Sequence, residues 1–156
     1  MGTNHRLVLI AGLVGGFSVL GSRPAAGQLP SDPCALLTPA QVSGVLGATA
    51  SKGDSIGSTG CAWATPAQGD TPPMRATLSL WDGSAFAGMK APLPGIKNQP
   101  APGIGDDAVY ATIGSLTTLS VKKGNVAFVV RIYGVSGQAK QMAMEKALAL
   151  DVIAKL

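Results

Sequence analysis

The sequence predicts an α+β fold, in which a single antiparallel sheet packs against an N-terminal short helix and a long C-terminal helix. Three observations lead to this prediction: a helix-start signal near residue 38, two strand-like runs joined by a turn within residues 116–133, and an amphipathic segment from about residue 136 to the end. The chain is short and shows no repeat, so we expect one domain with one core.

The first residues have the composition of a signal peptide. Arg6 gives a positive start, residues 7–20 are uncharged and mostly apolar, and small residues lead up to Gly27. We therefore expect a signal peptide over residues 1–27 and a mature domain over residues 28–156, secreted or held in the periplasm or cell envelope of a bacterium. A retained membrane anchor is the alternative, but the apolar run falls short of the roughly 20 residues that cross a bilayer. No stable membrane span is expected after cleavage.

The charge of the chain is modest. Its formal net charge is +4 at pH 7, and loss of Arg6 and Arg23 with the signal lowers this by two. The remaining basic residues are scattered, with Lys122 and Lys123 as the only adjacent pair. Nucleic-acid binding normally needs a clustered basic patch, so no nucleic-acid partner is expected.

The chain has two cysteines, Cys34 and Cys61. In an exported protein the oxidising compartment favours a bond between them, which would staple the first helix to an early strand. In the chain-entropy model, closing this loop stabilises the fold by about 3.5 kcal/mol. Two buried free thiols are the alternative.

The first helix has a clear start and a clear end. Thr38 is placed as the N-cap, Pro39 occupies the first helical position, and Gln41 completes a capping box. Gly47 is placed to end the helix. Two turns are too few to be stable alone, so this helix must dock on the rest of the fold.

Alternating and β-rich segments predict the strands. We expect strands at residues 61–63, 76–81, 108–112, 116–121 and 126–133, the last two forming a hairpin, with residues 47–60 as loop or weak edge strand. Trp63 is expected to fill the core, with ligand stacking as the alternative. In the last strand Val126, Phe128, Val130 and Ile132 form the inward face. Val129, Arg131 and Tyr133 fall on the other face, and we expect the last helix to cover that face.

Residues 91–105 contain four prolines and three glycines. This composition predicts a long loop without regular structure, and such loops are often functional. A binding role for this loop and a passive crossover are the two hypotheses. Before it, residues 84–90 predict a helical turn around Phe86 and Met89.

The last helix has a broad apolar arc at 3.6 residues per turn, which predicts that it docks on the sheet. The arc consists of Met142, Leu148, Ala149, Val152, Ile153 and Leu156.

Several of these segments resemble an exported actinobacterial lipoprotein-like domain family of unknown function. The shared features are Asp32-Pro33-Cys34 running into Leu37-Thr38-Pro39, the Cys61-x-Trp63 segment, the Gly103-Ile104-Gly105-Asp106-Asp107-Ala108 turn and the C-terminal helix. The resemblance covers about residues 32–156 and implies a small α+β domain, with no established activity or catalytic residues. Many relatives have a lipid-attachment cysteine directly after the signal. Here Gly27-Gln28-Leu29 stands there instead, which favours free secretion or a periplasmic location.

Much catalytic chemistry is excluded by composition. The lone histidine, His5, lies in the signal, so the mature chain lacks a histidine for a catalytic triad or a zinc site. Asp106 and Asp107 are the only adjacent carboxylates, and neighbours in an extended chain point apart. We interpret them as turn residues, with a calcium site as the alternative. No catalytic residue, cofactor or metal is predicted.

These observations favour a non-catalytic, exported binding module, whose partner is an unknown envelope protein or a small ligand. Two alternatives remain open. One is a carrier of a small apolar ligand held between sheet and helix. The other is a histidine-independent hydrolase that uses Ser and Lys, for which Ser136 and Lys140 have helical spacing.

Overall fold

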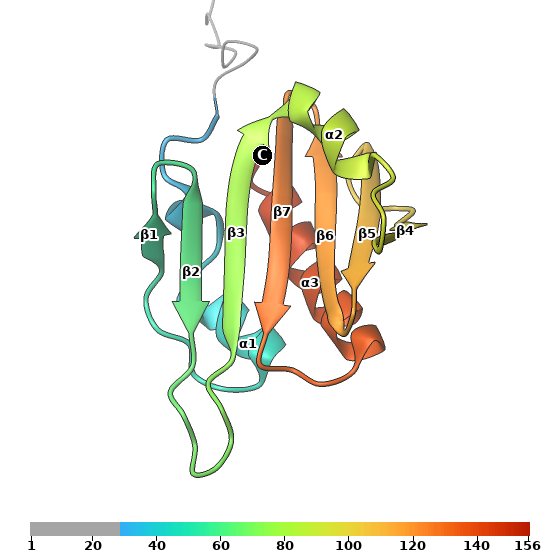
Figure 1. Ribbon diagram of the computed structural model, residues 1–156. Helices are drawn as coiled ribbons and strands as arrows, with labels where there is room; N and C mark the ends of the chain where they lie inside the picture. The colour runs from blue at the N-terminus through green and yellow to red at the C-terminus, as the bar shows by residue number, and fades with distance from the viewer. Residues whose placement is uncertain (1–28) are drawn as a thin grey trace, which may run out of the picture.

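A computed structural model describes residues 29–156 as one seven-stranded antiparallel sheet with helices packed on it (Figure 1). The strand order is β1-β2-β3-β7-β6-β5-β4. The strands are β1 (Asp54–Ile56), β2 (Gly60–Ala64), β3 (Arg75–Asp82), β4 (Lys97–Pro100), β5 (Asp107–Ile113), β6 (Leu116–Lys123) and β7 (Val126–Tyr133). The helices are η1 (Pro33–Leu36), α1 (Pro39–Leu46), η2 (Gly83–Ala85), α2 (Phe86–Lys90) and α3 (Gln138–Ile153). The predicted α+β class is confirmed, with a short N-terminal and a long C-terminal helix. The expected signal peptide lies outside the described residues.

The predicted capping box of α1 is present. Thr38 Oγ1 accepts the backbone N–H of Gln41 at 3.2 Å, and Gln41 Oε1 accepts the backbone N–H of Thr38 at 2.9 Å. Gly47 follows with φ of 71°, a left-handed conformation that suits glycine and ends the helix. The start and end of α1 are therefore set locally by its own sequence.

Cys34 and Cys61 form the predicted disulfide, with 5.2 Å between their Cα atoms. The bond ties η1, just before α1, to the centre of β2. It fits an oxidising compartment outside the cytoplasm. The described residues contain no helix with the length and apolarity needed to cross a membrane.

The turn of the β6–β7 hairpin is held by the neighbouring Asp106. Its carboxylate accepts the backbone N–H of Gly124 at 2.6 Å and lies 3.2 Å from Lys123 Nζ. These hydrogen bonds lower the pKa of Asp106. Asp107 pairs instead with Lys90 at 2.6 Å. The two adjacent carboxylates thus have different partners, and only Asp106 lies in the turn, because Asp107 is the first residue of β5.

The prediction that residues 91–105 lack regular structure is wrong in part. Residues Lys97–Pro100 form β4, which pairs with β5 through Lys97 and Thr112 at one end and Pro100 and Val109 at the other. Pro100 is tolerated because β4 lies at the sheet edge, where a missing N–H need not break a ladder. Asn98 also closes the loop, since its Nδ2 donates to the carbonyl of Lys90 at 3.1 Å.

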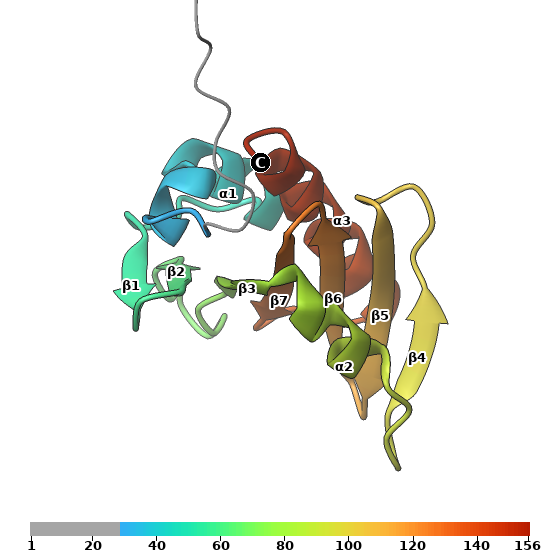
Figure 2. The ribbon, with the colours of Figure 1, turned by 90° about the horizontal axis from the view of Figure 1, so that it is seen from above.

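The helices are unevenly divided between the two faces of the sheet (Figure 2). η1, α1 and α3 lie on one side, which we call the covered face, and only the short α2 crosses the other, which we call the open face. The covered face carries Phe128, Val130 and Ile132, all fully buried. The expectation that the last helix covers Val129, Arg131 and Tyr133 is therefore wrong. α3 packs on the opposite side because that side offers the larger continuous apolar surface.

The covered face holds the main core of the protein. Leu148, Ala149 and Val152 of α3 are fully buried against it. Trp63 is also buried there, with 1% exposure, so it fills the core as expected. On the open face, α2 makes a small separate cluster in which Phe86 packs with Val109 and Ala127. This cluster covers one corner and leaves the rest of the open face without helices.

Candidate functional site

Period-two alternation places a row of side chains on the open face of four neighbouring strands. Cross-strand pairing puts Trp81 of β3 beside Ala127 of β7, and Ser120 of β6 beside Val129 of β7. Because side chains two apart share a face, Arg131 lies on this face as well. The open face is therefore built by β3, β7, β6 and β5 together.

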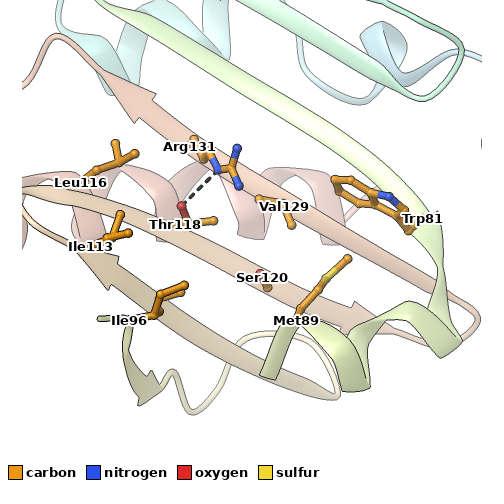
Figure 3. Close-up of a pocket in the computed structure, with 10 residues that line it drawn as sticks. Trp81, Met89, Ile96, Ile113, Leu116, Thr118, Ser120, Val129 and Arg131 are labelled. Atoms are coloured by element: carbon orange, nitrogen blue, oxygen red, sulfur yellow. Dashed lines mark hydrogen bonds between the residues drawn. The ribbon is translucent and has the colours of Figure 1, made fainter. Parts of the chain in front are cut away.

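A groove of about 390 Å³ lies on this face, and we call it the open-face groove. Figure 3 shows Trp81 and Met89 at one end, with Ile96, Ile113 and Leu116 at the other. Trp81 is 40% exposed and Ile113 56% exposed, unusually high for large apolar side chains. The lining also includes Ala111, Thr118, Ser120, Val129 and Arg131.

Among the described residues 29–156, Arg131 is the only charged one that lines the groove. Its Nε donates to Thr118 Oγ1 at 3.1 Å, a bond that Figure 3 marks, and this holds the guanidinium over the middle of the sheet. Arg131 also borders an adjoining hollow of about 570 Å³, to which Arg75 and Tyr133 contribute. The open face thus combines an apolar groove with positive charge at its side.

A groove with this lining can hold the apolar part of a ligand and orient its polar or charged group. Pockets of a few hundred Å³, lined mainly by apolar and aromatic side chains with a few polar groups, are typical of small-ligand sites. Met89 and Trp81 provide adaptable and flat contact surfaces respectively. Thr118 and Ser120 supply hydroxyls on the floor of the groove.

A second polar feature lies on the covered face, beneath α3. Glu145 and Thr117 are fully buried, and Gln141 is 6% exposed. Gln141 Nε2 donates to the carbonyl of Val135 at 2.7 Å, which turns its Oε1 toward Thr117. That Oε1 accepts the backbone N–H of Thr117 at 3.0 Å. We call Thr117, Gln141 and Glu145 the buried polar cluster.

The hydroxyl of Thr117 shows which protonation state of Glu145 fits the buried polar cluster. Thr117 Oγ1 lies 3.1 Å from Gln141 Oε1 and 3.0 Å from Glu145 Oε2. A hydroxyl has one proton, so it cannot donate to both oxygens. When Glu145 is a protonated acid, it donates to Thr117, and Thr117 donates to Gln141. An ionised Glu145 would leave one of these oxygen pairs without a proton between them.

Burial also favours the protonated form of Glu145. Desolvation raises its pKa from 4.5 to about 7, although the hydrogen bond from Thr117 and the charge of Arg131 lower it. Its Oε1 has no hydrogen-bond partner within residues 29–156. Nearby, the Tyr110 hydroxyl donates to the carbonyl of Met142 at 2.9 Å, and burial raises the pKa of Tyr110. The neutral acid is therefore the form that the covered face accommodates.

The residues predicted from the sequence fall at separate places. Ser136 and Lys140 are both exposed near the start of α3, away from the open-face groove. The 91–105 loop contributes Ile96 to the groove. Within residues 29–156 no three Asp, Glu, His or Cys side chains gather closely enough to hold a metal ion.

Sequence reasoning missed the polar members of the buried face of α3. Gln141 and Glu145 share that face with Leu148, Ala149 and Val152. Their spacing of four, three, one and three residues follows one face of an α-helix, so the pattern was readable. It was missed because only apolar residues were placed on the arc.

No protein-family model, curated protein or solved structure matches this chain.

Proposed function

We propose that this protein is an exported, non-catalytic binding module that acts in the bacterial cell envelope or outside the cell, and that it binds a small apolar ligand in the open-face groove. The observation that carries the proposal is the exposure of Trp81 and Ile113 within one continuous groove. An exposed apolar groove in a small domain is costly unless it is covered by a ligand or partner.

The compartment is supported by two independent features. The first residues of the chain have the charge and apolar pattern of an export signal. The Cys34–Cys61 bond is of a kind that persists in oxidising surroundings. The resemblance to exported lipoprotein-like domains remains a prediction that agrees with both.

The composition of the groove supports binding over catalysis. Its polar lining consists of two hydroxyls and one guanidinium, from Thr118, Ser120 and Arg131. None of these is a general base near neutral pH without an activating neighbour. In the part of the chain that the structure describes, the groove lining holds no carboxylate, lysine or histidine that would activate a hydroxyl.

The open-face groove is a better site for a small ligand than the space between sheet and helix that the sequence suggested for a carrier. The space beneath α3 is occupied by Leu148, Ala149 and Val152, which are fully buried. The groove on the other face has the volume of a small-ligand site. The same ligand class is therefore proposed on the opposite side of the sheet.

The proposal is tested by titrating the purified protein with the neutral fluorescent probe N-phenylnaphthylamine. We expect saturable binding, and Ile113→Ser should weaken it about tenfold because the probe loses the burial of one large side chain. Leu150→Ser is the matched control, since Leu150 is 44% exposed on α3. An equal effect of both substitutions, or no saturable binding by folded protein, would contradict the proposal.

A further inference from the structure

We propose that the ligand of the open-face groove is a free, monomeric medium-chain carboxylate, with its head group at Arg131 and its chain directed over Val129 toward Trp81. This inference rests on the proposed function and narrows it to one class of ligand. It follows from the charge, the donor geometry and the length of the groove.

Arg131 and Arg75 on this face form no salt bridge within residues 29–156. Arg131 lines both the groove and the adjoining hollow, and Arg75 lines the hollow. Neither lining includes an Asp or a Glu from the described residues. Both salt bridges within residues 29–156 involve lysines, Lys90 and Lys123. An anionic group is therefore the complement that this face lacks.

The geometry of Arg131 suits a carboxylate. Its bond to Thr118 uses Nε, and this is the only side-chain hydrogen bond of Arg131 within residues 29–156. A guanidinium has five N–H donors in a planar fork, so four remain on the two terminal nitrogens. A carboxylate can accept two of them side by side, and such paired, charge-assisted bonds are among the stronger ones.

Thr118 gives this arrangement its orientation. The bond to Nε fixes the plane of the guanidinium instead of leaving a flexible side chain in solvent. Figure 3 shows the guanidinium standing on the groove wall between the Trp81 end and the Leu116 end. A head group bound there would place an attached chain against Val129, in the groove that leads to Trp81.

The length of the groove sets the size of the chain. Arg131 pairs with Thr77 of β3. Trp81 lies four residues further along β3, so this separation sets the distance between Arg131 and Trp81 along the strand direction. At about 3.3 Å per residue this is a path of about 13 Å. Val129 lies between Arg131 and Trp81 along this direction, and Met89 borders the same path. A medium-length alkyl chain such as that of dodecanoate fits this distance.

Calorimetric titration of the purified protein tests the proposal with three single-chain probes at concentrations below micelle formation: dodecanoate, dodecanol and dodecyltrimethylammonium. We expect dodecanoate to bind at least about tenfold more tightly than dodecanol, because a charge-assisted bond to arginine is added to the same chain. The cationic probe should bind most weakly of the three.

Substitutions then test whether the preference for dodecanoate over dodecanol depends on Arg131. Arg131→Gln should abolish the advantage of dodecanoate over dodecanol, whereas Lys140→Gln, which removes the same charge from α3, should keep it. Arg131→Lys should retain part of the advantage, since the charge remains and the fork is lost.

Three results would overturn the inference. They are equal affinity for dodecanoate and dodecanol, an unchanged preference in Arg131→Gln, or binding to anionic vesicles without binding of monomeric dodecanoate. Saturable binding of the neutral N-phenylnaphthylamine in any of these cases would leave the binding module standing without its carboxylate specificity. Loss of neutral-probe binding as well would reject both.

Discussion

The two faces of the sheet are made by the same strands and differ in what lies over them. On the covered face, α1, α3 and η1 bury Leu119, Phe128 and Val130 completely. On the open face, α2 alone covers one corner, and Trp81 and Ile113 keep about half of their surface in solvent. Alternation along each strand divides its side chains between two faces, and the face with the larger apolar surface has been used to build the core.

Two adjacent threonines on β6 show most directly how the surroundings of a side chain differ between the two faces. Thr117 points to the covered face and is enclosed with Gln141 and Glu145, where a buried polar atom without a partner is costly. Thr118 points to the open face and holds Arg131 for contact with solvent or ligand. A hydroxyl on one face therefore serves stability, while under the proposed function its neighbour serves binding.

The largest expected effect comes from removing the disulfide, which should lower the stability of the fold without changing binding at the open face. Replacing Cys34 and Cys61 with serine should lower the free energy of unfolding by about 3.5 kcal/mol, because the unfolded chain is no longer closed. Groove binding in the folded protein should persist, since the bond joins η1 and β2 and does not reach the groove lining. Denaturant unfolding and probe titration measure the two effects, and reduced wild-type protein is the control. An unchanged unfolding midpoint would contradict this account.

The next effect concerns the proton on Glu145. Its native pKa of about 7 lies above the ordinary 4.5, so between these values the folded protein binds more protons than the unfolded chain. The stabilisation is complete below about pH 4.5 and is lost as the pH rises through about 7, a change of about 3 kcal/mol.

Glu145→Gln should remove this part of the pH dependence, because an amide keeps the size of the side chain and does not titrate. Asp151→Asn on the same helix is the matched control and should leave the slope in place. Denaturant unfolding from pH 4 to pH 8 supplies the measurement. Equal slopes in wild type and Glu145→Gln would show that this carboxyl is not the titrating group.

The smallest effect compares the two threonines. Thr117→Val should destabilise the protein by about 1–3 kcal/mol, because Gln141 and Glu145 lose a buried partner. Thr118→Val should change stability by less than about 0.5 kcal/mol, as expected for a surface site, and should weaken dodecanoate binding by loosening Arg131. Thermal unfolding and calorimetry distinguish the two results. Similar destabilisation by both substitutions would show that the open face contributes to stability as the covered face does.

Local signals in the chain were sufficient for most of the elements. The Thr38–Gln41 capping box and Gly47 gave both ends of α1 because capping depends on residues within one turn. The alternation at residues 126–133 gave β7 and its apolar face for the same local reason. The disulfide was predicted from the presence of two cysteines in a chain that we expected to be exported.

Features that depend on distant partners were predicted poorly. β4 was missed because its strand conformation comes from pairing with β5, while its own sequence is rich in turn and breaker residues. The groove was not predicted at all, since Trp81, Met89, Ile113 and Arg131 come from four separate elements. The place of α3 was predicted on the wrong face, because the strand pattern alone does not say which of two apolar faces a helix will choose.

The sequence by itself determined the class of the fold, the limits of its first helix, the hairpin and the covalent tie, because these depend on neighbours along the chain or on composition. Tertiary structure decided which face is covered, which polar side chains are enclosed and where apolar surface is left exposed. Burial depends on which distant residues pack over a side chain. The partners of Thr117, for example, are Gln141 and Glu145, which lie 24 and 28 residues away in the sequence. The candidate binding site is accordingly a product of packing, because it joins strand residues to Met89 of α2 and to Ile96 of the loop before β4.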